Sequence, residues 1–177
     1  MERFRIAISR CLLGERVRYD GGARHAGAVV PALAREADFV RICPEVESGM
    51  PIPREPAEIG GTPFNPTFYC FGSGRNLTTR LMAWVWPRLE LFDREPVHGL
   101  VLKSNSPSCA VVTPKRIYRR DGRSAGSSFG LFARAFCERF PSVPVADEVL
   151  LADPCRREEF MVRVRKYAAE QRSILHG

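Results

Sequence analysis

Apolar residues follow two different spacings along this chain, and segments of the two kinds alternate. Short and nearly continuous apolar runs are typical of buried strands, and they predict strands at residues 4–9, 39–43, 67–71, 99–103 and 143–145. Apolar residues three or four positions apart share one face of a helix, and they predict helices at residues 26–37, 77–92, 129–140 and 154–171. Residues 48–66 are rich in proline and glycine and predict a long ordered loop.

Two of the expected helices begin with clear start signals. Asn76 stands where an N-cap residue is expected, and Asp153 is an N-cap residue followed by Pro154 at the first helical position. Strands that alternate with helices favour a parallel sheet covered on both faces. We therefore expect an α/β fold, namely a Rossmann-like three-layer domain with a mostly parallel sheet and helices on both faces.

The length and composition are those of one globular domain that spans residues 1–177. Hydrophobic residues make up 45% and charged residues 27%, which is ordinary for a folded domain in water. No apolar run is long enough to cross a bilayer, and the first ten residues lack the apolar core of a secretory signal. We expect a cytoplasmic protein with no membrane partner, and the pattern leaves the oligomeric state open.

Charge adds a hint about the partner. The chain has a formal net charge of +7, and only three of its 27 basic residues are lysines. Arginine suits bidentate recognition of phosphate, so a phosphorylated or nucleic-acid partner is one interpretation, and an arginine-rich genome is the other. A basic stretch around Tyr118 is either a phosphate- or RNA-contacting patch or a solvated face. Its basic members are Lys115, Arg116, Arg119, Arg120 and Arg123.

Six cysteines are the main candidates for chemistry. No C-x-x-C pair is present, so neither a zinc ribbon nor a thioredoxin-type pair is indicated, and a cytosolic chain does not use a disulfide framework. Three of them, Cys11, Cys43 and Cys109, lie at or beyond the carboxyl ends of predicted strands, where parallel sheets bind ligands. The remaining ones, Cys70, Cys137 and Cys155, suit ordinary packing, as a lone cysteine usually does.

Three converging thiolates suit either zinc or an iron–sulfur cluster. A four-iron cluster takes one ligand on each iron, so three cysteines would leave one iron free. The spacing alone does not decide between these metals, nor between a metal site and three small buried side chains.

Four stretches then point to a family. They are Cys-Leu-Leu-Gly at 11–14 with Arg-Tyr-Asp-Gly-Gly at 18–22, Cys-Pro-Glu-Val at 43–46 with Pro-Arg-Glu-Pro at 53–56, Val-Leu-Lys-Ser-Asn-Ser-Pro-Ser-Cys at 101–109, and Gly-Leu-Phe-Ala-Arg at 130–134. In this order they resemble the bacterial thiouracil desulfurases, a family formerly catalogued as a domain of unknown function. The resemblance covers residues 5–167.

The resemblance implies a [4Fe–4S] cluster held by Cys11, Cys43 and Cys109, with one iron that has no protein ligand. It also implies a non-redox desulfuration of thiolated pyrimidines: thiouracil, 4-thiouridine, its nucleotide, or the modified base within tRNA. The thiocarbonyl sulfur would bind the free iron, water would replace it at carbon, and the sulfur would leave as hydrosulfide. Glu45 would act as the base and Ser106 as its partner or proton relay. A solvated loop carboxylate and a turn former are the plainer interpretations of these two residues.

The resemblance is strongest to a longer subgroup, linked to 4-thiouridine in tRNA, in which a second helical domain follows. This chain ends at Gly177, before any such domain. It departs from the family at Ala110, where glycine is usual, and at Asn105, which is often arginine. We expect these departures to alter the backbone approach to the cluster and the substrate contacts.

The remaining candidates are expected to bind substrate. The Asp20-Gly21-Gly22 turn offers backbone amides to an anion, or is a plain turn. Arg54 would line the pocket or form an ordinary salt bridge, and the resemblance adds Lys103 and Ser104. The main alternative function is a non-catalytic RNA-binding or sulfur-carrier module with a structural metal site. A closed site with four protein ligands would favour it.

Overall fold

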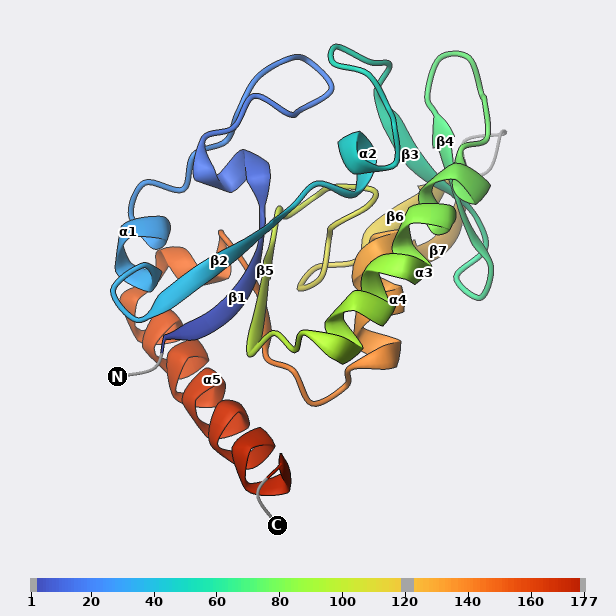
Figure 1. Ribbon diagram of the computed structural model, residues 1–177. Helices are drawn as coiled ribbons and strands as arrows, with labels where there is room; N and C mark the ends of the chain where they lie inside the picture. The colour runs from blue at the N-terminus through green and yellow to red at the C-terminus, as the bar shows by residue number, and fades with distance from the viewer. Residues whose placement is uncertain (1–2, 119–122, 176–177) are drawn as a thin grey trace.

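A four-stranded parallel sheet forms the centre of the protein (Figure 1). The computed structural model describes residues 3–118 and 123–175. The sheet has the order β2-β1-β5-β8, and all neighbouring strands run parallel. Its strands are β1 (Phe4–Ser9), β2 (Ala37–Ile42), β5 (Gly99–Leu102) and β8 (Val145–Asp147). The predicted strands at 4–9, 39–43, 99–103 and 143–145 are thus confirmed, within the usual uncertainty of strand ends.

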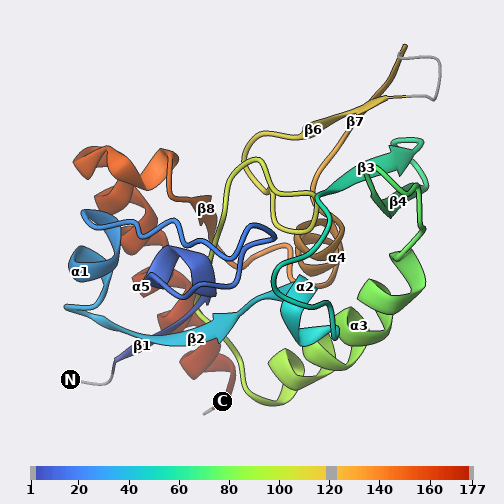
Figure 2. The same ribbon diagram turned by 90° about the horizontal axis from the view of Figure 1, so that it is seen from above.

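Helices cover both faces of this sheet (Figures 1 and 2). On one face lie α1 (Val29–Leu33) and α5 (Pro154–Leu175), and on the other lie α3 (Thr78–Arg94) and α4 (Leu131–Arg139). Side chains along a strand alternate between the faces. Ile6 and Ile8 accordingly join the core under α1 and α5, whereas Ala7 joins the core under α3 and α4. The expected three-layer α/β fold is confirmed.

Two antiparallel hairpins lie outside the central sheet. One pairs β3 (Ala57–Gly61) with β4 (Pro66–Cys70), and the other pairs β6 (Lys115–Tyr118) with β7 (Ser124–Ser128). Strand β3 packs against β6, so the two hairpins stand next to each other. No helix in the described part of the chain is long and apolar enough to cross a bilayer.

Two expected elements differ in the structure. The helix expected at 26–37 is only five residues long, because the chain turns after Leu33 and Ala37 already pairs with Phe4 as the start of β2. The segment 48–66, expected to be a loop, contains strand β3. Its residues are poor strand formers, but hydrogen-bonded pairing with β4 holds them in an extended conformation. The start of α5 is as expected, with the Asp153 side chain accepting the Cys155 amide at 2.7 Å. Helix α3 begins one residue later than expected: Leu77 is its N-cap residue, and Asn76 lies just before it, accepting the Thr78 amide at 2.9 Å.

Candidate functional site

The three singled-out cysteines converge at the carboxyl edge of the sheet. Cys11 lies in the short 3-10 helix η1 (Arg10–Leu13) directly after β1, Cys43 directly follows β2, and Cys109 lies in the loop after β5. These strands are neighbours in the sheet, and all three residues line one cavity of about 390 Å³. No other described cysteine or histidine lines this cavity. Parallel strand order therefore brings together thiols that are far apart in sequence.

Local backbone structure holds the first two cysteines. Gly14, with a φ of 93°, ends η1 in the left-handed conformation, which glycine adopts without steric cost. The Cys11 carbonyl accepts the amide of Arg24 at 2.9 Å, which ties the following loop to this turn. Cys43 caps the one-turn helix α2 (Pro44–Glu47), and its own amide donates to the Glu47 carboxylate at 2.7 Å.

A close approach between a loop and helix α4 holds the third cysteine. The Cys109 amide donates to the Ser106 hydroxyl at 3.2 Å, and the amide of Phe132 in α4 donates to the Ser108 carbonyl at 3.1 Å. A Cβ at position 130 would collide with the backbone of Ser108, so the start of α4 reaches the loop only because residue 130 is glycine. This contact gives the glycine of the fourth sequence motif a structural role beside the site.

Burial governs the protonation of the three thiols. Burial raises the pKa of the Cys11 thiol to about 11, with a further rise from Cys43 and an opposing effect of Lys103. It also raises the pKa of Cys43 and Cys109, and in Cys109 the neighbouring Cys43 adds to the rise. A buried neutral thiol is a poor nucleophile, whereas metal binding displaces its proton. These cysteines are therefore better suited to hold a metal group than to attack a substrate.

The donor atoms of the three cysteines suit an iron–sulfur cluster. Within residues 3–118 and 123–175, no group of three or more His, Cys, Asp or Glu side chains could hold one metal ion. Thiolates that each bind a different iron stand apart around a cluster, and soft thiolate ligands select iron–sulfur centres. Three cysteines around one cavity offer thiolate ligands of the kind that an iron–sulfur cluster takes.

Glu45 lies beside the cysteines in a tightly bonded unit. Its side chain is 13% exposed and pairs with Arg54, which is 8% exposed. Two guanidinium nitrogens of Arg54 donate to Glu45 Oε2, at 2.9 and 2.7 Å, and the Ser108 hydroxyl donates to Oε1 at 2.9 Å. Arg54 thus lines the cavity and forms a salt bridge, so both interpretations of this residue apply. Glu45 is held in one orientation next to Cys43.

Ser108 is the serine that sequence reasoning missed. Ser106 was expected to contact Glu45, but its hydroxyl lies 3.1 Å from the Ser108 hydroxyl, and Ser108 makes the contact to Glu45. Ser108 is buried, and its hydroxyl is also 3.5 Å from Cys109 Sγ. Ser106 therefore reaches Glu45 only through Ser108. The signal in the sequence that could have revealed Ser108 was its place directly before the expected ligand Cys109.

Lys103 lines the cavity, but Ser104 does not. The ammonium group of Lys103 and the hydroxyl and amide of Ser104 all bind Glu148, which follows β8. Burial disfavours the charge of Glu148, but the bonds from Lys103 and Ser104 outweigh it and lower the pKa of this carboxyl. Glu148 was not identified from the sequence, because only the sheet brings it next to Lys103. Ser104 acts on the site by helping to anchor this network.

The predicted anion-binding turn also lies off the cavity. Asp20, Gly21 and Gly22 do not line it, although the preceding Arg18 and Tyr19 do. The Gly22 amide donates to Asp20 Oδ1 and the Gly21 amide donates to the Arg18 carbonyl, so both amides are used within the turn. The plain-turn interpretation therefore describes these residues better.

The two departures from the family pattern fit their surroundings. Asn105 has a φ of 51°, a left-handed conformation that asparagine adopts more readily than most residues with a side chain. Ala110 is fully buried, and its carbonyl accepts the Gly130 amide at 2.8 Å. Of the expected basic patch, Arg119 and Arg120 lie outside the described residues, and Lys115 and Arg116 lie on β6.

Comparison with known proteins gives three matches. The profile of the 2-thiouracil desulfurase family matches residues 6–148. The uncharacterized protein YbbK of Bacillus subtilis (strain 168) is 37% identical over 109 residues, which are 59% of this chain and 72% of that protein. Among solved structures, the [4Fe-4S]-dependent thiouracil desulfidase TudS superposes with a TM-score of 0.64 at 33% identity, covering 85% of this chain and 94% of that chain.

Proposed function

The chain belongs to the 2-thiouracil desulfurase family, and from that premise we propose that it replaces the sulfur of a thiolated pyrimidine by oxygen without a redox step. The candidate substrates are thiouracil, 4-thiouridine, its nucleotide, and tRNA that carries 4-thiouridine. Water supplies the oxygen, and the sulfur leaves as hydrosulfide. The observation that carries the proposal is the cavity in which three cysteines from adjacent strand ends meet the buried carboxylate of Glu45.

Cys11, Cys43 and Cys109 are proposed to hold a [4Fe–4S] cluster with one iron free of protein ligands. The similarity to TudS, a protein described as [4Fe-4S]-dependent, supports this assignment. When bound, the cluster supplies a Lewis-acidic iron with affinity for soft thiocarbonyl sulfur. The described lining of the cavity offers no fourth cysteine or histidine, which disfavours the closed four-ligand site of a purely structural metal. A non-catalytic module is therefore the weaker alternative.

The protein groups around the cysteines are proposed to handle the protons. Glu45 takes a proton from water, and the pair with Arg54 keeps its carboxylate oriented for this step. The Ser108 and Ser106 hydroxyls form a hydrogen-bonded chain that starts at Glu45 Oε1 and along which a proton can pass. Lys103 places a positive charge on the cavity wall, where it favours the thiolate form of Cys11. Each role belongs to a residue whose contacts hold it in place.

Anaerobic reconstitution tests the cluster. The protein should bind iron and sulfide and convert 4-thiouracil to uracil with release of hydrosulfide, without any electron donor. Alanine at 11, 43 or 109 should abolish iron binding and visible absorbance, whereas the Cys70→Ala, Cys137→Ala and Cys155→Ala variants should retain both. Loss of the cluster in Cys70→Ala but not in Cys43→Ala would contradict the ligand assignment. A strict need for a reductant would overturn the non-redox reaction.

Replacing Glu45 by glutamine tests the base. The amide keeps the size and much of the hydrogen bonding of the carboxylate but cannot accept the proton, so iron content should persist while turnover falls by roughly 10²–10⁴-fold. Glu138→Gln is the matched control, since Glu138 is an exposed carboxylate of α4 paired with Arg134. Full activity in Glu45→Gln would remove Glu45 as the base.

A further inference from the structure

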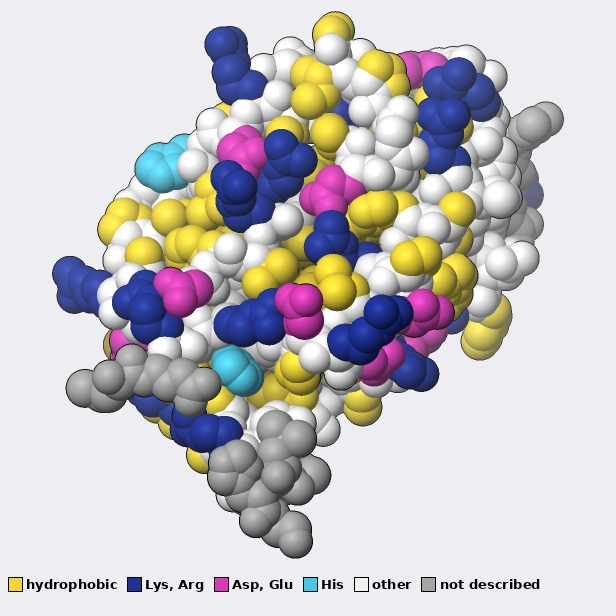
Figure 3. Space-filling view, viewed as in Figure 1, with side chains coloured by type: hydrophobic (Ala, Val, Ile, Leu, Met, Phe, Trp, Pro, Cys, Tyr) yellow, Lys and Arg dark blue, Asp and Glu magenta, His cyan; other side chains and the backbone are white. Residues whose placement is uncertain are grey.

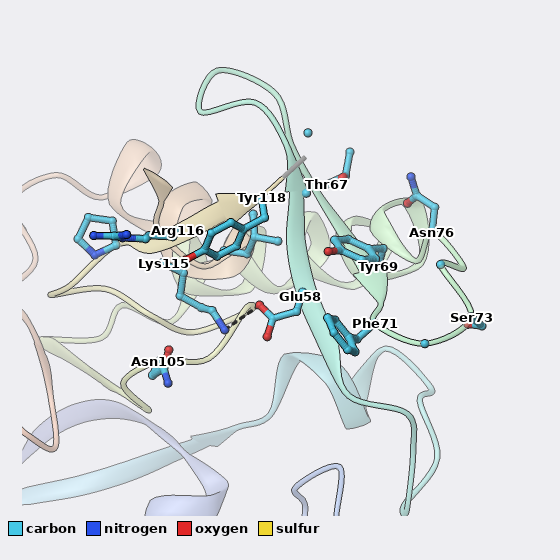
Figure 4. Close-up of a pocket in the computed structure, with 16 residues that line it drawn as sticks. Glu58, Thr67, Tyr69, Phe71, Ser73, Asn76, Asn105, Lys115, Arg116 and Tyr118 are labelled. Atoms are coloured by element: carbon cyan, nitrogen blue, oxygen red, sulfur yellow. Dashed lines mark ion pairs between the residues drawn. The ribbon is translucent and has the colours of Figure 1, made fainter. Parts of the chain in front are cut away.

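A second and larger cavity opens beside the cysteine cavity. It lies between the two hairpins and has a volume of about 1140 Å³, against about 390 Å³ for the cysteine cavity. Figure 4 shows its lining, with Lys115 and Glu58 joined by an ion pair of 3.0 Å. Three residues line both cavities: Glu58, Asn105 and Lys115. The hairpin groove, as we call the larger cavity, is therefore continuous with the site of the proposed reaction.

The lining of the hairpin groove combines exposed aromatic rings with positive charge. Phe71 is 69% exposed and Tyr118 is 51% exposed, and Tyr69 lies on the neighbouring strand β4. Arg116 is exposed and makes no ion pair with any residue that the structure describes. Glu58 is the one acidic residue of the described lining, and Lys115 neutralises it. Within its described lining, the groove therefore offers aromatic rings and the positive charge of Arg116, and its one carboxylate is already paired.

Folding accounts for only part of this arrangement. The Tyr69 ring packs against Gly60 of the paired strand, where a Cβ would lie 2.9 Å from a ring carbon, so strand pairing explains its position. Neither Phe71 nor Tyr118 makes a ring contact within the described chain. Phe71, Tyr118 and an arginine with no ion pair among the described residues thus line one groove, where their exposed groups are available to a ligand.

Total charge does not locate a binding surface on this protein. On the face drawn in Figure 3, basic side chains are scattered and many lie beside acidic ones. The hairpin groove differs because Arg116, which has no ion pair among the described residues, lines the same cavity as Tyr69, Phe71 and Tyr118. Rings that accept stacked bases, next to cations that track phosphates, are the means by which proteins bind single-stranded nucleic acid.

We propose that the hairpin groove binds the nucleotides adjacent to the thiolated pyrimidine in single-stranded RNA. The inference rests on the proposed function, because it places the thiolated base in the cysteine cavity and its neighbour in the groove. Bases stack on Tyr118 and Phe71, and Arg116 binds a backbone phosphate. A thiolated uracil is an RNA base, and the groove is about three times larger than the cavity proposed for the base itself. The protein is therefore expected to favour an oligonucleotide substrate over a free base.

Binding of an unmodified RNA tests the groove independently of catalysis. A fluorescent pentauridylate is titrated into the reconstituted protein and followed by anisotropy. Tyr118→Ala should weaken binding roughly 5- to 150-fold, the loss expected for one stacked base, and Tyr118→Phe should restore it. Arg116→Ala should reduce the slope of log affinity against log salt by about 0.7, as expected for one lost phosphate contact on a single strand.

Trp86→Ala and Arg163→Ala are the matched controls. Trp86 is 53% exposed on α3 and Arg163 is exposed on α5, and neither lines a described cavity. Both variants should bind pentauridylate like the unaltered protein. Unchanged affinity and salt slope in Tyr118→Ala and Arg116→Ala, or an equal loss in the controls, would overturn the proposal.

Substrate ranking gives the second test. A pentanucleotide with one central 4-thiouridine should be desulfurated with a higher kcat/KM than 4-thiouridine monophosphate, and this preference should disappear in Tyr118→Ala and Arg116→Ala. Equal kcat/KM for the two substrates would overturn the groove as an RNA site. If RNA binding depends on these residues but no desulfuration occurs, the groove stands and the proposed reaction fails. If free 4-thiouracil is desulfurated but the protein does not bind RNA, the proposed reaction stands and the groove fails as an RNA site.

Discussion

Replacing Arg54 by methionine removes the only cation that contacts Glu45 in the described structure. Methionine keeps much of the length of the side chain but donates no hydrogen bond. Glu45 is 13% exposed and Arg54 is 8% exposed, so the carboxylate would stay buried without its partner. Arg54 also donates to the carbonyls of Val17 and Pro51, at 3.1 and 3.3 Å, and these bonds tie two loops to the site.

The expected cost follows from burial. Removing one partner of a buried ion pair typically costs about 3–5 kcal/mol, because the other charge is left without compensation. In a chain of this length, about 1 kcal/mol lowers the melting temperature by about 2–4 °C, so Arg54→Met should melt about 6–20 °C lower. Adding Glu45→Gln to Arg54→Met should recover part of the loss, since no buried charge then remains. We expect a coupling of about 0.5–3 kcal/mol between the two positions.

Denaturant and thermal unfolding of the four proteins in this cycle measure the coupling. The chain offers an exposed comparison in Arg165, which donates two hydrogen bonds to Glu36, at 3.0 and 2.9 Å, in a pair that is 37% and 41% exposed. Arg165 also donates to the exposed Glu158 at 2.8 Å. Arg165→Met should cost about 1 kcal/mol or less, as exposed pairs do. Equal and small losses in Arg54→Met and Arg165→Met would refute the reasoning that burial makes the Glu45 pair strong.

Two further predictions concern the neighbours of this pair. Ser108→Ala leaves Glu45 Oε1 without its hydroxyl donor, so the free energy of unfolding should fall by about 1–3 kcal/mol. Turnover should also fall while the iron content persists. Unaltered turnover would exclude a proton relay through Ser108. Glu148 has a lowered pKa, so it stabilises the fold above the ordinary glutamate pKa of about 4.3, and this stability is lost as the pH falls through its folded value. Glu148→Gln should therefore reduce stability at pH 7 and flatten the acid-unfolding curve, and an unchanged curve would show that the bonds from Lys103 and Ser104 do not stabilise its charge.

The strands of the central sheet were predictable because their pattern is local. A buried parallel strand is apolar on both faces, and residues 99–102 show this directly in the sequence. The helix expected at 26–37 was too long because Ala37, four positions after Leu33, continues the helical spacing although it starts a strand. Only pairing with β1 reveals that Ala37 is extended. Strand β3 was missed for the same reason, since its partner β4 supplies the bonds that its own composition does not predict.

The sequence by itself determined the order of the strands and helices of the central three-layer domain, and it singled out three cysteines that follow strands. Those features depend on side-chain spacing and on turn residues next in the chain, and local backbone geometry controls both. The tertiary structure alone decided that Ser108 contacts Glu45 across 63 positions and that Glu148 anchors Lys103 across 45. It also placed a groove of two hairpins beside the cysteines. Contacts of this kind depend on strand order in the sheet and on the close approach of α4 at Gly130, which no local pattern encodes.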